Sequence, residues 1–187
     1  MNNKLAKAIT VITLIATMLL AGCSEKKTIT LEQYKSTDSD YNMLMQNIFS
    51  EQFVAKFEID KTVKSIKIGK ECYKDGKLTY DEKVVSVKRK EKNTGMLGIM
   101  FMDNKEMCVI STDERTVSSL ITAPHWMESG AYVSLEDPEE KIEKRKKVYV
   151  YAASKGGDSE TISPQLDSKD DDLNRHGYAC YYYVMFE

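Results

Sequence analysis

The sequence predicts a mainly β domain, an antiparallel β-sandwich or a barrel-like sheet, with a short N-terminal helix. About nine short segments alternate apolar and polar residues, and polar turn residues separate them at regular spacing. Few segments have the period expected of crossover helices, so a parallel α/β sheet is not expected. These two observations favour consecutive antiparallel strands.

Length and charge restrict the function further. The chain has 187 residues, of which 42% are hydrophobic, enough for one domain with a core. Basic and acidic side chains are nearly balanced, at 27 and 29. Most nucleic-acid-binding domains are strongly basic, so we expect no nucleic-acid partner.

The first 22 residues have the features of a secretory signal. Lys4 and Lys7 precede an uncharged, largely apolar run from Ala8 to Gly22. At 15 residues the run is shorter than the ~20 that a membrane-spanning helix needs. It ends in Leu20-Ala21-Gly22-Cys23, and this motif resembles the lipobox of bacterial lipoproteins. The resemblance implies removal of residues 1–22 and attachment of a diacylglycerol, with fatty acids such as palmitate, at Cys23.

This processing defines the expected domain organisation. Residues 23–38 become the lipidated cysteine and a polar tether, and residues 39–187 become a single β-rich extracytoplasmic domain. Two acyl chains anchor a protein durably, so the membrane is the expected partner through the lipid on Cys23. The composition, rich in Lys, Ile and Tyr, favours a location on the outer face of a Gram-positive cytoplasmic membrane. Lipoproteins share no common fold or activity, so the resemblance predicts location only.

The first predicted element of the domain is a helix near residues 40–50. Its apolar residues, spaced at i, i+3, i+4, i+7 and i+8, are Tyr41, Leu44, Met45, Ile48 and Phe49. From Phe53 onward the period changes to two, which predicts strands. The helix is therefore expected to lead into the sheet.

Two hairpins follow. Residues 64–73 alternate, with Ile66, Ile68 and Cys72 on one face, and Asp75-Gly76 supplies a turn that needs positive φ. The chain then returns through residues 78–80 and 84–87. The continuous apolar run 96–102 predicts a strand buried on both sides or under a helix, and residues 107–110 pair back along it.

Further strands are predicted at residues 117–122, 131–135, 148–153 and 178–186. The last has the densest apolar stripe of the chain, on even positions from Tyr178 to Phe186, so we expect it at the centre of the fold. Residues 136–147 predict a short solvated helix or a charged loop, and residues 154–174 a long mobile loop.

Four aromatic or imidazole side chains are candidate ligand contacts. His125 and Trp126 lie in a predicted loop, and Tyr181 and Tyr183 share the odd-numbered face of the last strand. Exposed rings of this kind stack on sugars or anchor protein partners. In the alternative, Trp126 plugs the end of the core and the two tyrosines are covered strand residues.

The sequence has no recognisable catalytic, cofactor-binding or metal-binding motif. We therefore expect a non-enzymatic binding or accessory module of the cell envelope, without cofactor or metal, with an envelope protein or polymer as partner. The alternative is an envelope hydrolase that uses His125 or His176, the two histidines of the chain.

Two charged segments allow a second interpretation. Residues 158–172 contain six acidic side chains that could surround Ca²⁺, but they lack the spacing of known calcium loops, which favours a solvated loop. Residues 60–92 contain 11 basic and six acidic side chains. This surplus either faces anionic lipid headgroups or, as we favour here, protects strand edges from aggregation.

Three cysteines remain after Cys23. Cys72, Cys108 and Cys180 allow one disulfide in three possible pairings. Cys72 and Cys180 have the same inward parity, so either a bridge between them or simple apolar packing fits. Buried thiols are slightly favoured over a disulfide.

Overall fold

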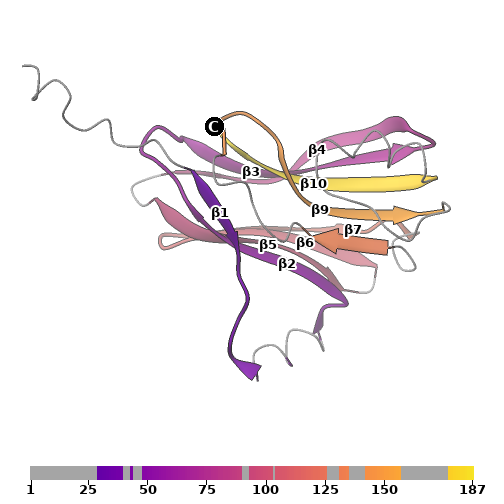
Figure 1. The fold of residues 1–187 in the computed structure, drawn as a ribbon, viewed down its shortest axis with the longest axis horizontal. Coiled ribbons are helices and arrows are strands. Elements are labelled where there is room, and N and C mark those ends of the chain that lie inside the picture. Colours follow the sequence, from indigo (N-terminus) through magenta and orange to yellow (C-terminus); the bar gives the residue numbers. More distant parts are fainter. Residues whose placement is uncertain are drawn as a thin grey trace, which may run out of the picture.

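The computed structural model describes residues 29–39, 43, 48–89, 93–102, 104–125, 131–134, 142–156 and 177–187. Ten strands in this part of the chain form two five-stranded antiparallel sheets that lie face to face (Figure 1). The prediction of a mainly β, antiparallel fold is confirmed. The sheets are separate, so the architecture is a sandwich and not a closed barrel.

Each sheet combines hairpins with more distant strands. The first sheet has the order β1 (Thr30–Gln33), β2 (Glu51–Glu58), β5 (Thr94–Met102), β6 (Lys105–Thr112) and β7 (Thr116–Thr122). The second has the order β4 (Lys77–Lys88), β3 (Ser65–Lys74), β10 (Tyr178–Phe186), β9 (Val148–Lys155) and β8 (Ala131–Ser134).

Aromatic contacts across the sandwich join the two sheets. Phe101 of β5 stacks on Tyr151 of β9, with ring centroids 5.2 Å apart. Phe57 of β2 meets Phe186 of β10 edge to face at 6.3 Å. Such ring pairs stabilise the fold by more than the burial of their apolar area alone. They place β2 and β5 opposite β9 and β10.

The C-terminal strand has the central position that its apolar stripe predicts. β10 pairs with β3 on one side and with β9 on the other. Its inward residues Cys180, Tyr182, Val184 and Phe186 are fully buried. Because β10 completes the second sheet, its removal would separate β3 from β9.

The sandwich has two distinct ends. At the proximal end the described chain begins, with Thr30 opposite Glu58, and the C-terminal residue Glu187 accepts a backbone hydrogen bond from Ser65 at 3.0 Å. At the distal end lies the β3–β4 turn. Its residues Asp75 and Gly76 have φ values of 49° and 73°, which confirms the predicted Asp-Gly turn.

The N-terminal boundary of the domain differs from the predicted one. Residues 30–33, expected to lie in the tether, form β1 on the edge of the first sheet. Ile29 and Leu31 are only 2% and 3% exposed, so this segment belongs to the core. Four residues are too few for the period of two to stand out in the sequence.

Other predicted segments are only partly tested. β4 is one continuous strand with register shifts, where two shorter segments were expected. The helix predicted at 40–50 lies mostly outside the described residues and stays a prediction, as does most of the loop at 154–174. Of the charged segment 136–147 only residues 142–147 are described, and Ile142 in it is buried.

Candidate ligand cavity

A cavity of about 480 Å³ opens at the distal end of the sandwich. It lies between β3 and β4 of the second sheet and the end of β7 of the first. Cavities of roughly 300–1,000 Å³ are typical of small-molecule sites. Its apolar surface comes from Ile121, Pro124 and Cys72, and Tyr73, Tyr80 and Tyr178 add phenol rings.

A buried ion pair lies at one wall of this cavity. Lys70 lines the cavity, and its Nζ lies 2.5 Å from Oε1 of Glu106 on the opposite sheet. The hydroxyl of Tyr182 donates a hydrogen bond to Oε2 of the same carboxylate. Lys70 is 4% exposed and Glu106 is fully buried. A buried charge requires partners of this kind, and here both carboxylate oxygens have one.

The ammonium group of Lys70 keeps donors for a ligand. It lies 5.4 Å from the ring centroid of Tyr80 and 5.6 Å from that of Tyr182, within the range of cation–π attraction. An ammonium has three N–H donors, and among the described residues Lys70 makes one hydrogen bond, to Glu106. Glu106 therefore neutralises Lys70 without using all of its donors, and the exposed Lys74 adds a second cation to the cavity wall.

Tyr80, Tyr182 and the free thiol of Cys108 stay protonated near this ion pair. Burial, together with the charge of Glu106, raises the pKa of Tyr182 well above its ordinary value of 10. The hydrogen bond to Glu82, followed by burial, raises the pKa of Tyr80 to about 12. Burial also raises the pKa of the Cys108 thiol, so this cysteine is not a ready nucleophile.

A disulfide forms part of the cavity. Cys72 and Cys180 face each other on β3 and β10, with Cα atoms 4.1 Å apart, and are joined by a disulfide. Of the alternatives left open by the sequence, the bridge is therefore the one observed, and the expectation of buried thiols is wrong for this pair. Cys108 is free and buried.

Tyr181 and Tyr183 do not form an exposed ligand-binding surface. Both lie on the outer face of the second sheet, yet Tyr181 is fully buried and Tyr183 is 6% exposed. Their rings pack edge to face on Tyr149, at 5.9 and 6.0 Å. The candidate role as open contacts is thus corrected, because the faces of these rings are occupied by neighbours.

The same outer face has a second polar network. Glu71 is 5% exposed and accepts hydrogen bonds from Tyr73 at 2.8 Å and Tyr149 at 2.9 Å. Lys147 bridges Glu71 and Asp81. Because both carboxylates already contact Lys147, we regard this network as structural.

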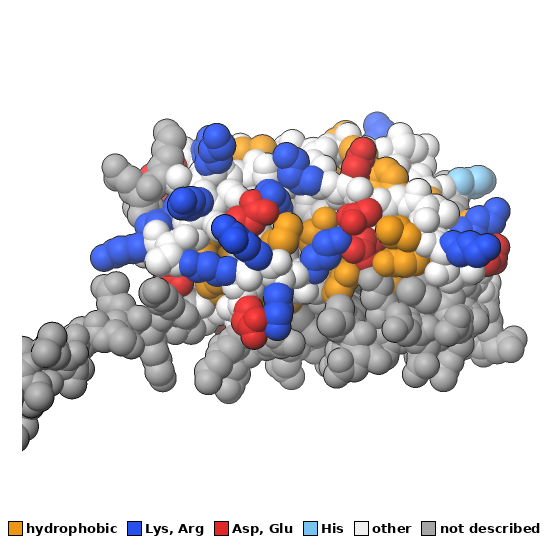
Figure 2. Space-filling model, turned by 90° about the horizontal axis from the view of Figure 1, so that it is seen from above, with side chains coloured by type: hydrophobic (Ala, Val, Ile, Leu, Met, Phe, Trp, Pro, Cys, Tyr) orange, Lys and Arg blue, Asp and Glu red, His pale blue; other side chains and the backbone are white. Residues whose placement is uncertain are grey.

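The other sequence-predicted residues do not meet in the described part of the chain. His125 is exposed at the distal end (pale blue in Figure 2) and does not line the cavity. Cys23, Trp126, His176 and the acidic segment 158–172 lie outside the described residues. Within the described ranges, no three His, Cys, Asp or Glu side chains cluster as a metal site requires.

Sequence reasoning missed Lys70 and Glu106, although the signal was present. Lys70 has the same parity as Ile66, Ile68 and Cys72, the inward face of its strand. A charged residue at a core position predicts a buried partner. Glu106 similarly precedes the inward Cys108 by two residues, but no sequence feature identifies it as the partner across the sandwich.

Comparisons with known proteins do not assign a family. No family model matches the chain, and neither the curated proteins nor the solved structures contain a significant match. None of the described residues belongs to a helix with the length and apolarity needed to cross a bilayer. The function must therefore be inferred from the residues of the chain itself.

Proposed function

We propose that this protein is a lipid-anchored, extracytoplasmic binding module of the cell envelope, and that it holds a small ligand in the distal cavity. The observation that carries the proposal is the largely apolar cavity with the ammonium of Lys70 in its wall. Small-molecule sites typically combine an apolar surface with a few fixed polar groups.

The surface of the cavity indicates the chemistry of the ligand. Glu106 already neutralises Lys70, so this buried part of the wall favours a neutral hydrogen-bond acceptor over a second full charge. Lys74, at the exposed part of the wall, adds a cation that can attract a polar or anionic group. The rings of Tyr80 and Tyr178 offer stacking surface, and Thr79 and Thr122 add hydroxyl groups. These features suit a small molecule with a ring and a carbonyl or hydroxyl group.

The cysteines support the extracytoplasmic part of the proposal. Disulfides persist mainly in oxidising compartments, and the Cys72–Cys180 bridge joins two central strands. The free Cys108 is buried, which shields its thiol from oxidation. Together with the lipobox-like motif ending at Cys23, these features fit an exported protein held by a lipid.

The hydrolase alternative lacks a comparable observation. General-base catalysis requires a histidine within hydrogen-bond reach of the group that it activates. His125 is exposed beyond the end of β7, and the surroundings of His176 lie outside the described residues. We therefore propose a binding role alone.

Filling the cavity tests the binding role. Ile121 lines the cavity, whereas the adjacent Leu120 points to the other face of β7 and is 54% exposed. Ile121→Trp should block the cavity, and Leu120→Trp is a matched control with the same added volume on the outside.

The assay incubates each purified protein with a small-molecule extract of the cell envelope and identifies retained compounds by mass spectrometry. Wild type and Leu120→Trp should retain the same compound, and Ile121→Trp should retain at least about tenfold less. Circular dichroism verifies that both variants are folded. Equal retention by all three proteins, or retention by none, contradicts the proposal.

A further inference from the structure

The position at which the chain joins the domain restricts how a lipid anchor would orient it. This step rests on the proposed anchor at Cys23. Ile29 is already buried in the core, and Thr30 is paired with Glu58 at the proximal end. A fully extended chain spans about 3.3–3.6 Å per residue, so Cys23 lies at most about 20 Å from Ile29. The proximal end must therefore stay close to the bilayer surface.

Basic side chains gather at this same end (left in Figure 2). They come from separate segments: the loop between β2 and β3, the end of β4, the turn between β6 and β7, and the segment before β9. Hydrogen bonds hold the first three of these segments together, from Arg89 to the carbonyl of Lys61 at 2.7 Å and from Arg115 to the carbonyl of Lys88 at 2.5 Å. The basic surface comprises Lys61, Lys64, Lys88, Arg89, Arg115 and Arg145.

Several neighbouring carboxylates are already occupied by other lysines. Asp60 pairs with Lys144 at 3.5 Å, Glu143 with Lys146 at 2.7 Å, and Glu187 with Lys67.

Lys64 and Lys88 are exposed and form no ion pair with a described carboxylate. Asp113 and Glu114 in the β6–β7 turn are the exposed acidic residues nearest to Arg115 in the sequence. Glu58 at the end of β2 is a third exposed acidic residue at this end. Against these three carboxylates the basic surface has six cationic side chains.

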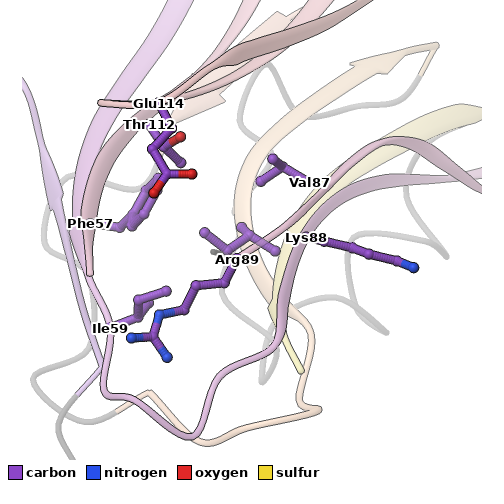
Figure 3. Close-up of a pocket in the computed structure, with 8 residues that line it drawn as sticks. Phe57, Ile59, Val87, Lys88, Arg89, Thr112 and Glu114 are labelled. Carbon is purple, nitrogen blue, oxygen red and sulfur yellow. The ribbon is translucent and has the colours of Figure 1, made fainter. Parts of the chain in front are cut away.

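The proximal end offers a surface and not a pocket. Figure 3 shows the cleft between the sheets there, with Phe57, Ile59 and Val87 as its apolar walls. Its volume is about 10 Å³, room for one water molecule at most. Lys88 points away from the cleft, toward solvent (Figure 3). A broad anionic surface fits these groups better than a small anion would.

We propose that the basic surface at the proximal end docks onto anionic phospholipid headgroups of the membrane that holds Cys23. Basic residues near a membrane surface are attracted by its negative potential, and a covalent tether raises their effective concentration there. Docking would hold the sandwich upright, with the distal cavity opening away from the bilayer.

Lysine acetylation with a membrane-impermeant reagent tests this orientation. The lipidated mature protein, purified from membranes, is reconstituted into phosphatidylcholine vesicles with and without 30% phosphatidylglycerol. Mass spectrometry then gives the modification rate of each lysine. Lys77 and Lys105 are exposed at the distal end and serve as internal controls, because docking leaves them in solvent.

In phosphatidylglycerol vesicles, Lys64 and Lys88 should react about fivefold more slowly than in pure phosphatidylcholine, while Lys77 and Lys105 react equally in both. Salt at about 0.5 M should remove the difference, because it screens the attraction. Protection of Lys64 and Lys88 that does not depend on lipid charge overturns the docking proposal.

A charge-reversal pair gives a second test. The variant with Lys64→Glu and Lys88→Glu should lose the protection of Lys61, whereas the variant with Lys77→Glu and Lys105→Glu should retain it. If the protein does not float with vesicles at all, the anchor itself is refuted, and docking with it. If it floats but shows no differential protection, only docking is refuted.

Discussion

Removal of Lys70 should be among the most damaging single changes in the core. Lys70→Met retains most of the side-chain volume but leaves the carboxylate of Glu106 without its cation. Glu106 is fully buried, and its carboxylate contacts Lys70 and Tyr182. In the variant the hydrogen bond from Tyr182 remains and the ion pair with Lys70 is lost. Breaking a buried ion pair in this way costs about 3–5 kcal/mol, a large fraction of the ~5–15 kcal/mol that stabilises most domains.

The double variant Lys70→Met/Glu106→Leu should recover most of that loss. Replacing both members of a buried pair with apolar residues is often neutral or stabilising. What remains is the hydroxyl of Tyr182 without its acceptor, a cost of about 1–3 kcal/mol. Adding Tyr182→Phe should remove that cost as well. The effects of Lys70→Met and Glu106→Leu should therefore be far from additive: the double variant should be much more stable than the sum of the two single variants predicts.

Urea unfolding followed by circular dichroism measures these free energies, with an unchanged denaturant slope as the test of two-state behaviour. Our account is refuted if Lys70→Met costs less than about 1 kcal/mol, which is the range of a solvent-exposed pair. It is also refuted if the double variant is as unstable as the single one.

Three further changes have definite expected outcomes. Gly69→Ala places a Cβ 2.2 Å from Cζ of Tyr183, so it should destabilise by about 1–3 kcal/mol in urea unfolding, whereas Gly177→Ala has its nearest atom at 3.4 Å and should change little. Reduction of the Cys72–Cys180 disulfide, which joins residues 108 positions apart, should lower the unfolding free energy by about 4–5 kcal/mol in the chain-entropy model. Because the pKa of Tyr182 is raised in the folded state, its contribution is complete below pH 10 and is lost at higher pH, by about 1.4 kcal/mol per pH unit. Tyr182→Phe should make the fall in stability between pH 10 and 12 less steep by about that amount, as measured by urea unfolding, while the other tyrosines with raised pKa values, such as Tyr80, keep their share of the slope.

The strands that the sequence predicted best are those with a characteristic pattern of residues within or beside the strand itself. The Asp75-Gly76 turn predicted the β3–β4 hairpin because few residue types adopt the positive φ that such a tight turn needs. The stripe on β10 predicted a central strand because it places five apolar or aromatic side chains on one face, and a central position buries that face most completely. β1 was missed because its four residues contribute to the core only through pairing with β2, which is a tertiary property.

The cavity could not be predicted from sequence. It arises where β3, β4 and β7 diverge at the distal end, and this depends on which strands oppose each other across the sandwich. Parity alone could have nominated Lys70 as a buried charge. Its partner Glu106 is 36 residues away on the other sheet, and no local pattern encodes that pairing.

Intact-mass measurement of the protein extracted from membranes tests most directly the claim that a lipid anchors this domain outside the cytoplasm. We predict a chain that begins at Cys23 and has the added mass of a diacylglyceryl group, which shifts to the labelled mass when cells are fed an isotopically labelled fatty acid. Cys23→Ala should abolish both the added mass and the membrane association. A mass that includes residues 1–22, or an unmodified Cys23 in membrane-associated protein, would contradict the account.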